Sequence, residues 1–125
     1  MIRSFAETPS IPNGISRIEK NAFISTKTLE SLTTPSSVSY VAEPLKIRTK
    51  EIVIEEGTVT IPSNLTAYPS TLTNIVIPDS VEYISNYAFN AAGYNDLGIT
   101  SLTLPKNLKE IGDYAFARCL NIKTL

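Results

Sequence analysis

Three segments of the chain share one pattern: IPNGISRIEKNAF (residues 11–23), IPDSVEYISNYAF (residues 77–89) and LPKNLKEIGDYAF (residues 104–116). They align without gaps. Counted from the proline of each segment, apolar residues recur at the third and sixth positions, and an Ala-Phe pair follows at the tenth and eleventh. Self-similarity at a period of about 20–50 residues indicates a stacked repeat architecture. We therefore expect a chain built from coils that bury their apolar edges on one another.

The residues that start the coils set the period. Pro12, Pro35, Pro78 and Pro105 mark four coil starts, and Glu55 takes the place of a lost proline, so that the spacings are 23, 20, 23 and 27 residues. The longest step contains four extra residues. We expect one domain, residues 1–125, of about five coils. Their ranges are 11–32, 33–54 and 55–77 (both degenerate), 78–104 (with an insertion) and 105–125.

Each coil start follows a short run in which apolar residues alternate with polar or β-branched ones. The four runs are LESLTTP (29–35), KEIVIEE (50–56), LTNIVIP (72–78) and ITSLTLP (99–105). Alternation and β-branched composition predict short strands, and the proline that follows ends the ladder. Beyond the proline, the spacing of three, six and ten residues predicts a short helical or 3-10 turn. The expected fold class is an α/β solenoid with parallel strands on one face and such turns on the other.

The last copy of the repeat, LPKNLKEIGDYAFARCLNIKTL (104–125), closely resembles the BspA-like leucine-rich repeat family, including Gly112 and Cys119. The copy starting at 77 departs from the family at Ser85, and the copy starting at 11 departs at Glu19. The resemblance implies a right-handed leucine-rich-repeat solenoid. It also implies a surface-associated protein that binds proteins or mediates adhesion. The expected location is the cell surface, the extracellular space or a virion, although the N-terminus shows no signal peptide.

Composition excludes several classes of function. Among 125 residues there are 11 basic and 12 acidic side chains, one cysteine and no histidine. The commonest general base and metal ligand is therefore missing, and no internal disulfide can form. A net charge of −1 argues against a nucleic-acid partner, and no run reaches the ~18 apolar residues of a membrane span. We expect no enzyme activity, no cofactor, no metal, and no small-molecule substrate.

Residues that recur once per coil are predicted to form the core. Each phenylalanine of the repeat follows a small alanine that permits close packing, which favours a buried position over a ligand contact. The cysteine of the last coil is expected inward, because a lone buried cysteine behaves as a small hydrophobic residue. The predicted core residues are Phe23, Phe89, Phe116, Ile84, Ile111 and Cys119.

The outward residues of the strands form the first candidate binding face. Aligning the coils by their starts places Ser31, Glu51, Asn74 and Ser101 in one row, and Thr33, Val53, Val76 and Thr103 in the next. These side chains are small, hydroxylated or β-branched. The rows are either a surface that binds a partner or an ordinary solvated sheet face, and the sequence leaves both interpretations open.

Two further features are candidates for contact with a partner. The insertion that breaks the period contains Tyr94, Asn95 and Asp96, and insertions into repeats often lie at a binding face. Tyr87 and Tyr114 occupy equivalent positions one coil apart. They are predicted to stack, either as a cover for the edge of the core or as a contact surface.

The leading hypothesis is a non-enzymatic protein–protein interaction or adhesion module. The alternative is a structural or decorating subunit of a larger assembly such as a virion, packed through the ends of its solenoid. Residues 120–125 repeat the start of a strand without a polar capping unit. We therefore expect a protein partner, or another copy of the chain, at the C-terminal edge.

Overall fold

The computed structural model describes residues 11–19, 22, 29–42, 49–65, 72–89 and 102–116. Eight short strands lie in this part of the chain. They are β1 (Arg17–Ile18), β2 (Leu32–Thr34), β3 (Tyr40–Val41), β4 (Glu51–Ile54), β5 (Thr60–Ile61), β6 (Asn74–Val76), β7 (Tyr83–Ile84) and β8 (Glu110–Ile111). All five strand pairs are parallel, as expected for coils that repeat in one direction.

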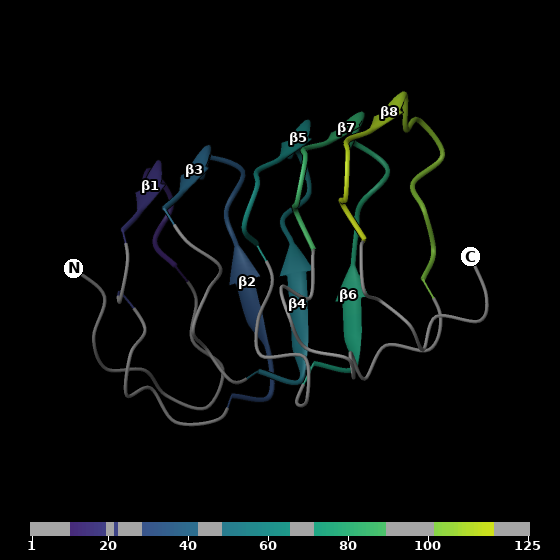
Figure 1. Ribbon diagram of the computed structural model, residues 1–125. Coiled ribbons are helices and arrows are strands. Elements are labelled where there is room, and N and C mark those ends of the chain that lie inside the picture. The colour runs from purple at the N-terminus through teal and green to yellow at the C-terminus, as the bar shows by residue number, and fades with distance from the viewer. Residues whose placement is uncertain are drawn as a thin grey trace.

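The strands form two stacks, and consecutive strands from β1 to β7 alternate between them. β2, β4 and β6 make one continuous three-stranded sheet, which we call the first stack. The second stack consists of the strands that follow the coil starts. It is divided into a β1–β3 pair and a β5–β7–β8 sheet. Figure 1 shows the coils side by side in chain order, with the two stacks along different edges.

The register of both stacks matches the spacing read from the sequence. Leu32 pairs with Ile52 and Ile52 with Ile75 in the first stack, which are offsets of 20 and 23 residues. Ile84 pairs with Ile61 and Ile111 in the second stack, at offsets of 23 and 27. The degenerate coil that starts at Glu55 is therefore in register with its neighbours. The coil boundaries themselves stay a prediction.

The helical or 3-10 segments expected after each coil start are wrong for the residues that the structure describes, which contain no helix. A β-turn follows the coil start, as in the 3.2 Å bond from the Val81 N–H to the Pro78 carbonyl. A two-residue strand comes next. A second turn then closes with the 3.2 Å bond from the Ala88 N–H to the Ser85 carbonyl. Two turns on either side of a short strand thus produce the spacing of three, six and ten residues that imitates a helix.

The core lies between the two stacks. Leu32, Ile52, Ile61 and Ile84 are at most 1% exposed, so both stacks send their apolar residues to the same interior. Many dispersion contacts within this close packing hold the coils together. Thr34, Thr49 and Thr58 are the buried polar residues in the described part of the chain. No side-chain nitrogen or oxygen atom buried there lacks a hydrogen-bond partner.

The predicted core residues behave differently along the stack. Phe89 is fully buried, and Phe116 of the next coil stacks on it with ring centroids 5.4 Å apart. Phe116 is only partly buried. Ile111 was expected in the core and is instead 44% exposed, because β8 is the last strand of its sheet and, among the described residues, pairs only with β7. Phe23 and Cys119 lie outside the described residues.

In the part of the chain covered by the structure, no helix has the length and hydrophobicity needed to cross a membrane.

Candidate interaction surfaces

The first row predicted on the strand face is a hydrogen-bonded ladder. The Ser31 hydroxyl donates to Oε1 of Glu51 at 3.0 Å, and the side-chain amide of Asn74 donates to Oε2 of Glu51 at 2.7 Å. One carboxylate therefore joins three successive coils. Ser101, predicted as the fourth member of this row, lies outside the described residues. We call this surface, with the row beside it, the ladder face.

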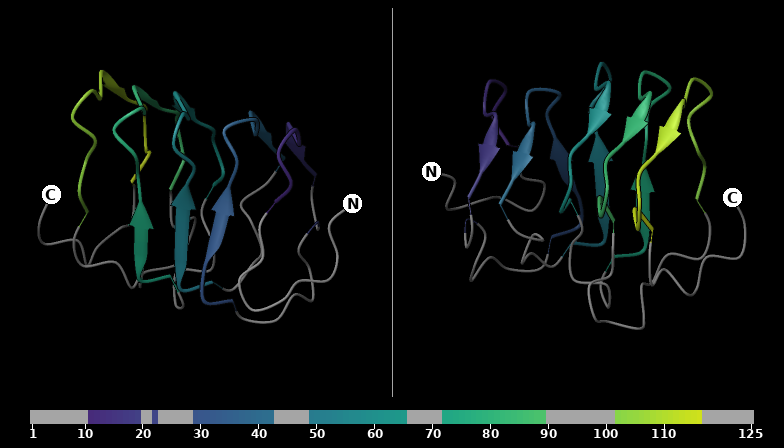
Figure 2. Two further views of the ribbon diagram at one scale, coloured as in Figure 1. Left: turned by 180° about the vertical axis from the view of Figure 1, so that it is seen from behind. Right: turned by 45° about the horizontal axis from the view of Figure 1, so that its top comes forward.

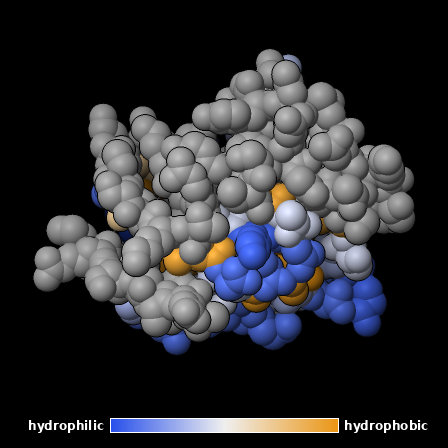
Figure 3. Space-filling model, turned by 90° about the horizontal axis from the view of Figure 1, so that it is seen from below, coloured by the Kyte–Doolittle hydropathy of each residue, from blue (hydrophilic) through white to orange (hydrophobic). Residues whose placement is uncertain are grey.

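The second row of the ladder face carries little apolar surface. Thr33, Val53 and Val76 are neighbours in register, and only Val76 is well exposed, at 41%. Thr103 is exposed and belongs to no strand. Seen from below, hydrophilic side chains gather where the strands of the first stack begin (Figure 3). The geometry thus gives a polar face whose central carboxylate already has its partners within the protein.

A second outward row, which the sequence reasoning missed, runs along the second stack. Its members are the exposed residues that come one position before the apolar residue of each strand: Arg17, Tyr40, Thr60, Tyr83 and Glu110. The guanidinium of Arg17 lies 4.3 Å from the ring centroid of Tyr40, a cation–π contact. This row was missed because the segment was expected to be helical. The available signal was the repeated pair of a polar or aromatic residue followed by an apolar one.

The turns after β7 and β8 carry a pair of exposed stacked tyrosines. The rings of Tyr87 and Tyr114 lie 5.2 Å apart at 14°, and the two residues are 45% and 64% exposed. Their φ angles are 61° and 58°, and Asn64, at the same position of an earlier coil, has a φ of 67°. Asparagine tolerates this left-handed region better than tyrosine does. We call Tyr83, Tyr87 and Tyr114 together the tyrosine face.

The backbone under the tyrosine face is held by bonds between coils. The N–H of Tyr87 donates to the Asp113 carbonyl at 2.9 Å, and the Asp113 N–H donates to Oδ1 of Asn86 at 2.6 Å. A side chain at Gly112 would collide with the backbone of Ser85 and Asn86. The two coils therefore approach closely at this position, which fixes the relative placement of the stacked rings.

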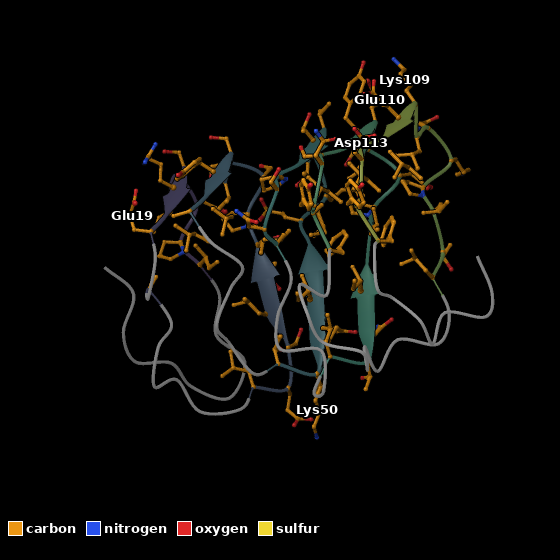
Figure 4. The ribbon with its side chains drawn as sticks, viewed as in Figure 1. Glu19, Lys50, Lys109, Glu110 and Asp113 are labelled. Carbon is orange, nitrogen blue, oxygen red and sulfur yellow. The ribbon has the colours of Figure 1, made fainter. Side chains whose placement is uncertain are left out.

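Ion pairs at the same end join the last two coils. Nζ of Lys109 lies 3.1 Å from Oε1 of Glu82, and the hydrogen bond and charge of Glu82 raise the pKa of Lys109. Oδ1 of Asp79 accepts the N–H of Lys106 at 3.0 Å, and this backbone bond lowers the pKa of Asp79. Figure 4 shows Lys109 at the β8 end of the molecule, far from the start of β4. Mixed charges thus flank the tyrosines.

A cleft of about 580 Å³ opens where the second stack is interrupted, between β3 and β5. Both views in Figure 2 show these two strands farther apart than the other neighbours in their stack. The cleft is lined by residues that include Tyr40 and Val41 on one side and Val59, Thr60 and Pro62 on the other. Tyr40 and Val59 are 44% and 48% exposed. This opening was not predicted from the sequence.

One ladder donor is missing from the sequence at the interruption. At the other three junctions of the second stack, the residue seven positions after the coil start donates its N–H to the preceding strand. These donors are Ala42, Ser85 and Gly112, with bond lengths of 2.9, 3.0 and 2.7 Å. The equivalent residue at the cleft is Pro62, which has no N–H. The carbonyl of Val41, left without that donor, accepts the side-chain amide of Asn64 at 3.0 Å instead.

The described coils contain no metal site, and the predicted insertion contact lies outside them. No three acidic or cysteine side chains there are grouped so that they could hold a metal ion. The candidate residues of the insertion, Tyr94, Asn95 and Asp96, lie outside the described residues.

Comparison with known proteins identifies the family to which these repeats belong. The sequence profile described as "BspA type Leucine rich repeat region (6 copies)" matches residues 4–123. A search of curated proteins gives no match. A similar solved structure is the crystal structure of a leucine rich cell surface protein from Faecalibacterium prausnitzii A2-165, with 18% identity and a TM-score of 0.49. The match covers 97% of this chain and 47% of that protein, so the chain spans about half its length. The chain belongs to the BspA-type leucine-rich repeat family.

Proposed function

We propose that the protein is a non-enzymatic protein-interaction module of the adhesion type, and that its partner contacts the tyrosine face. The observation that carries this proposal is the exposed stack of Tyr87 and Tyr114 on a backbone fixed by bonds between coils. Family membership supports a role at the cell surface, the extracellular space or a virion. It also supports the right-handed solenoid, which remains part of the proposal.

Tyrosine suits such a contact for physical reasons. It buries a large ring and keeps a hydroxyl for hydrogen bonding, and it has only two side-chain torsions to order on binding. Tyr87 and Tyr114 already have one ring held against the other, which lowers the entropy lost when a partner docks. The ladder face offers less, because the carboxylate of Glu51 is bonded on both oxygens within the protein.

The test uses asparagine at both turn positions. Tyr87→Asn with Tyr114→Asn preserves the turns, because Asn64 adopts the same positive φ in an earlier coil. Binding is measured by surface plasmon resonance against a panel of immobilised extracellular-matrix proteins. We expect at least one specific interaction, weakened about a hundredfold by the double variant, as truncation at a hot spot does.

Tyr40→Asn is the matched control, since Tyr40 is exposed to the same degree as Tyr87 but lies outside the tyrosine face. It should leave the interaction unchanged. The proposal is rejected if no matrix protein binds, or if the interaction survives the double variant.

A second candidate function is that of a structural subunit that packs end to end with copies of itself. The observation in its favour is Ile111, an apolar residue of the outermost strand β8 that is 44% exposed. An unpaired strand edge beside an apolar residue favours association with another strand. Sedimentation analysis should then show concentration-dependent assembly that Ile111→Lys abolishes. A monodisperse monomer at millimolar concentration would exclude this candidate.

A further inference from the structure

We infer that the cleft between β3 and β5 is a docking site for an extended peptide segment of a partner protein, which takes the place of a missing strand in the second stack. The inference is independent of the tyrosine face, from which the cleft differs in position and chemistry. It rests on the backbone groups that face the cleft, the shape of the space and the residues that line it.

The two strand edges across the cleft present unused backbone groups to each other. β3 bonds to β1 through the N–H groups of Ser39, Tyr40 and Ala42. The carbonyl of Ser39 faces the cleft, because the carbonyls of Val59 and Glu82, at the same position of later coils, accept from the strand that follows. The N–H of Val41, between Tyr40 and Ala42, points to the same side by alternation. β5 is engaged with β7 on its other side, so the N–H and carbonyl of Thr60 face the same space. No backbone bond joins β3 to β5 in the described coils.

A strand inserted into the cleft forms hydrogen bonds with these groups, as neighbouring strands do in the rest of the stack. Its N–H groups reach the carbonyls of Ser39 and Thr60, and its carbonyls accept the N–H groups of Val41 and Thr60. Extended peptides bind other proteins by this addition of a strand to a sheet edge, with affinity from main-chain bonds and specificity from alternate side chains. The cleft differs from an ordinary sheet edge because it offers two such edges at once.

The shape of the cleft restricts the side chains of the segment. Its volume of about 580 Å³ lies within the range of ligand pockets. Behind it, the space lined by Val38, Pro62 and Leu65 holds only about 10 Å³. The inward side chain of the segment must therefore be small, such as alanine, glycine or serine. The outward side chain lies between Tyr40 and Thr60.

The lining also fixes the charge of the segment. The thirteen lining residues that the structure describes include no acidic or basic side chain. A charged residue on the segment would lose water without gaining a partner, which is costly. A neutral segment in which threonine alternates with alanine or another small residue fits both the shape and the chemistry.

The experiment uses the hexapeptide Thr-Ala-Thr-Ala-Thr-Ala, acetylated and amidated at its ends, titrated into the ¹⁵N-labelled protein. We expect amide shifts at Val41 and Thr60, with none at Ile52 of the continuous first stack. Methylation of the central alanine nitrogens should weaken binding about tenfold, because it removes backbone donors and leaves the side chains in place. Pro62→Ala restores the ladder donor, allows the strands to close, and should also weaken binding about tenfold.

Any of the following results overturns the inference. Absence of shifts at millimolar peptide, equal binding of the methylated peptide, or unchanged binding by Pro62→Ala excludes strand insertion. Shifts at Val41 and Thr60 that appear on concentrating the protein alone identify a second copy as the occupant instead. The variant Tyr87→Asn with Tyr114→Asn should bind the hexapeptide normally, so failure of this site and failure of the tyrosine face are distinguishable. Circular dichroism checks that each variant keeps its fold.

Discussion

The two strand stacks of this protein receive strands from the same coils and differ in continuity. The first stack pairs β2, β4 and β6 without a break, whereas the second is interrupted between β3 and β5 (Figure 1). The apolar residues beside the break, Val41 and Ile61, are as well buried as those of the continuous sheet. Burial of apolar side chains and pairing of backbone groups are therefore separable in a repeat protein.

One residue contributes directly to this separation. In the first stack no proline lies within β2, β4 or β6, so every residue of these strands has an N–H to donate. In the second stack Pro62 stands where the other junctions have a donor. The hydrophobic core continues beneath the break because it needs only side-chain contact, and the ladder stops because it needs the N–H group.

Truncation of a core residue should lower the free energy of unfolding more beside the first stack, which is continuous, than beside the second stack, which is interrupted. Ile52 and Ile61 are both fully buried and lie on the consecutive strands β4 and β5. Ile52→Ala should lower the free energy of unfolding near the top of the range of about 2–5 kcal/mol for such a change. The loss for Ile61→Ala should lie near the lower end of this range, because the coils beside the cleft can relax into the space left by the removed side chain. Urea unfolding measures both, and equal losses would contradict the comparison.

Addition of a methyl group at Gly112 should destabilise the closed junction between β7 and β8. A Cβ there collides with the backbone of Ser85 and Asn86, which cannot move aside as the end of a flexible side chain can. We expect Gly112→Ala to lower the free energy of unfolding by about 1–3 kcal/mol in chemical denaturation. Ser85→Ala, at the same position one coil earlier, is the control and should have a much smaller effect. If both variants unfold alike, the close approach is not the cause.

Removal of the Asn64 side chain should weaken only the junction between β3 and β5, where the second stack is interrupted. Its amide donates to the Val41 carbonyl that Pro62 leaves without a backbone donor. Asn64→Gly keeps access to the positive φ of 67° and deletes this bond, at a cost of about 1 kcal/mol. Asn64→Ala should cost more, since alanine disfavours the left-handed region. A glycine variant as stable as the parent in urea would show that the bond contributes nothing.

Acid should weaken the closed junction slightly through Asp79. Its pKa is lowered in the folded state by the backbone N–H of Lys106, so its ionised form contributes stability above the ordinary pKa of about 4. That contribution is lost as the pH falls through the lowered value. The thermal midpoint of Asp79→Asn should therefore change less between pH 5 and pH 2 than that of the parent, on the order of a degree. Identical pH profiles would refute this role.

The sequence predicted the register of the coils because each apolar position recurs at a fixed distance from the coil start. It therefore placed Ser31, Glu51 and Asn74 together, and it aligned the degenerate coil through Glu55. The strands of the first stack followed from their alternating pattern. Periodicity of this kind shows which residues face the core, because the apolar core positions are the ones that repeat most regularly along the sequence.

The second stack escaped prediction because two turns and a short strand give apolar spacings close to those of a helix. Without that stack, the exposed row containing Tyr40 and Tyr83 could not be recognised. The cleft escaped for another reason, since side-chain patterns carry no information about backbone donors. Pro62 was visible in the sequence, seven positions after Glu55, and comparison with Ser85 and Gly112 at the same position was the signal that could have revealed the break.

The most direct test of the account is amide hydrogen exchange at Thr60 and Tyr83 in the free protein. The two residues are partners in register, with similar exposure to solvent, and their N–H groups point in the same direction along the stack. Tyr83 donates to the Val59 carbonyl at 3.1 Å, whereas Thr60 faces the cleft. We predict that the amide of Thr60 exchanges at least about tenfold faster than that of Tyr83, because only the latter is protected by a ladder bond. Equal protection of the two amides would show that the second stack is closed, and would contradict the account.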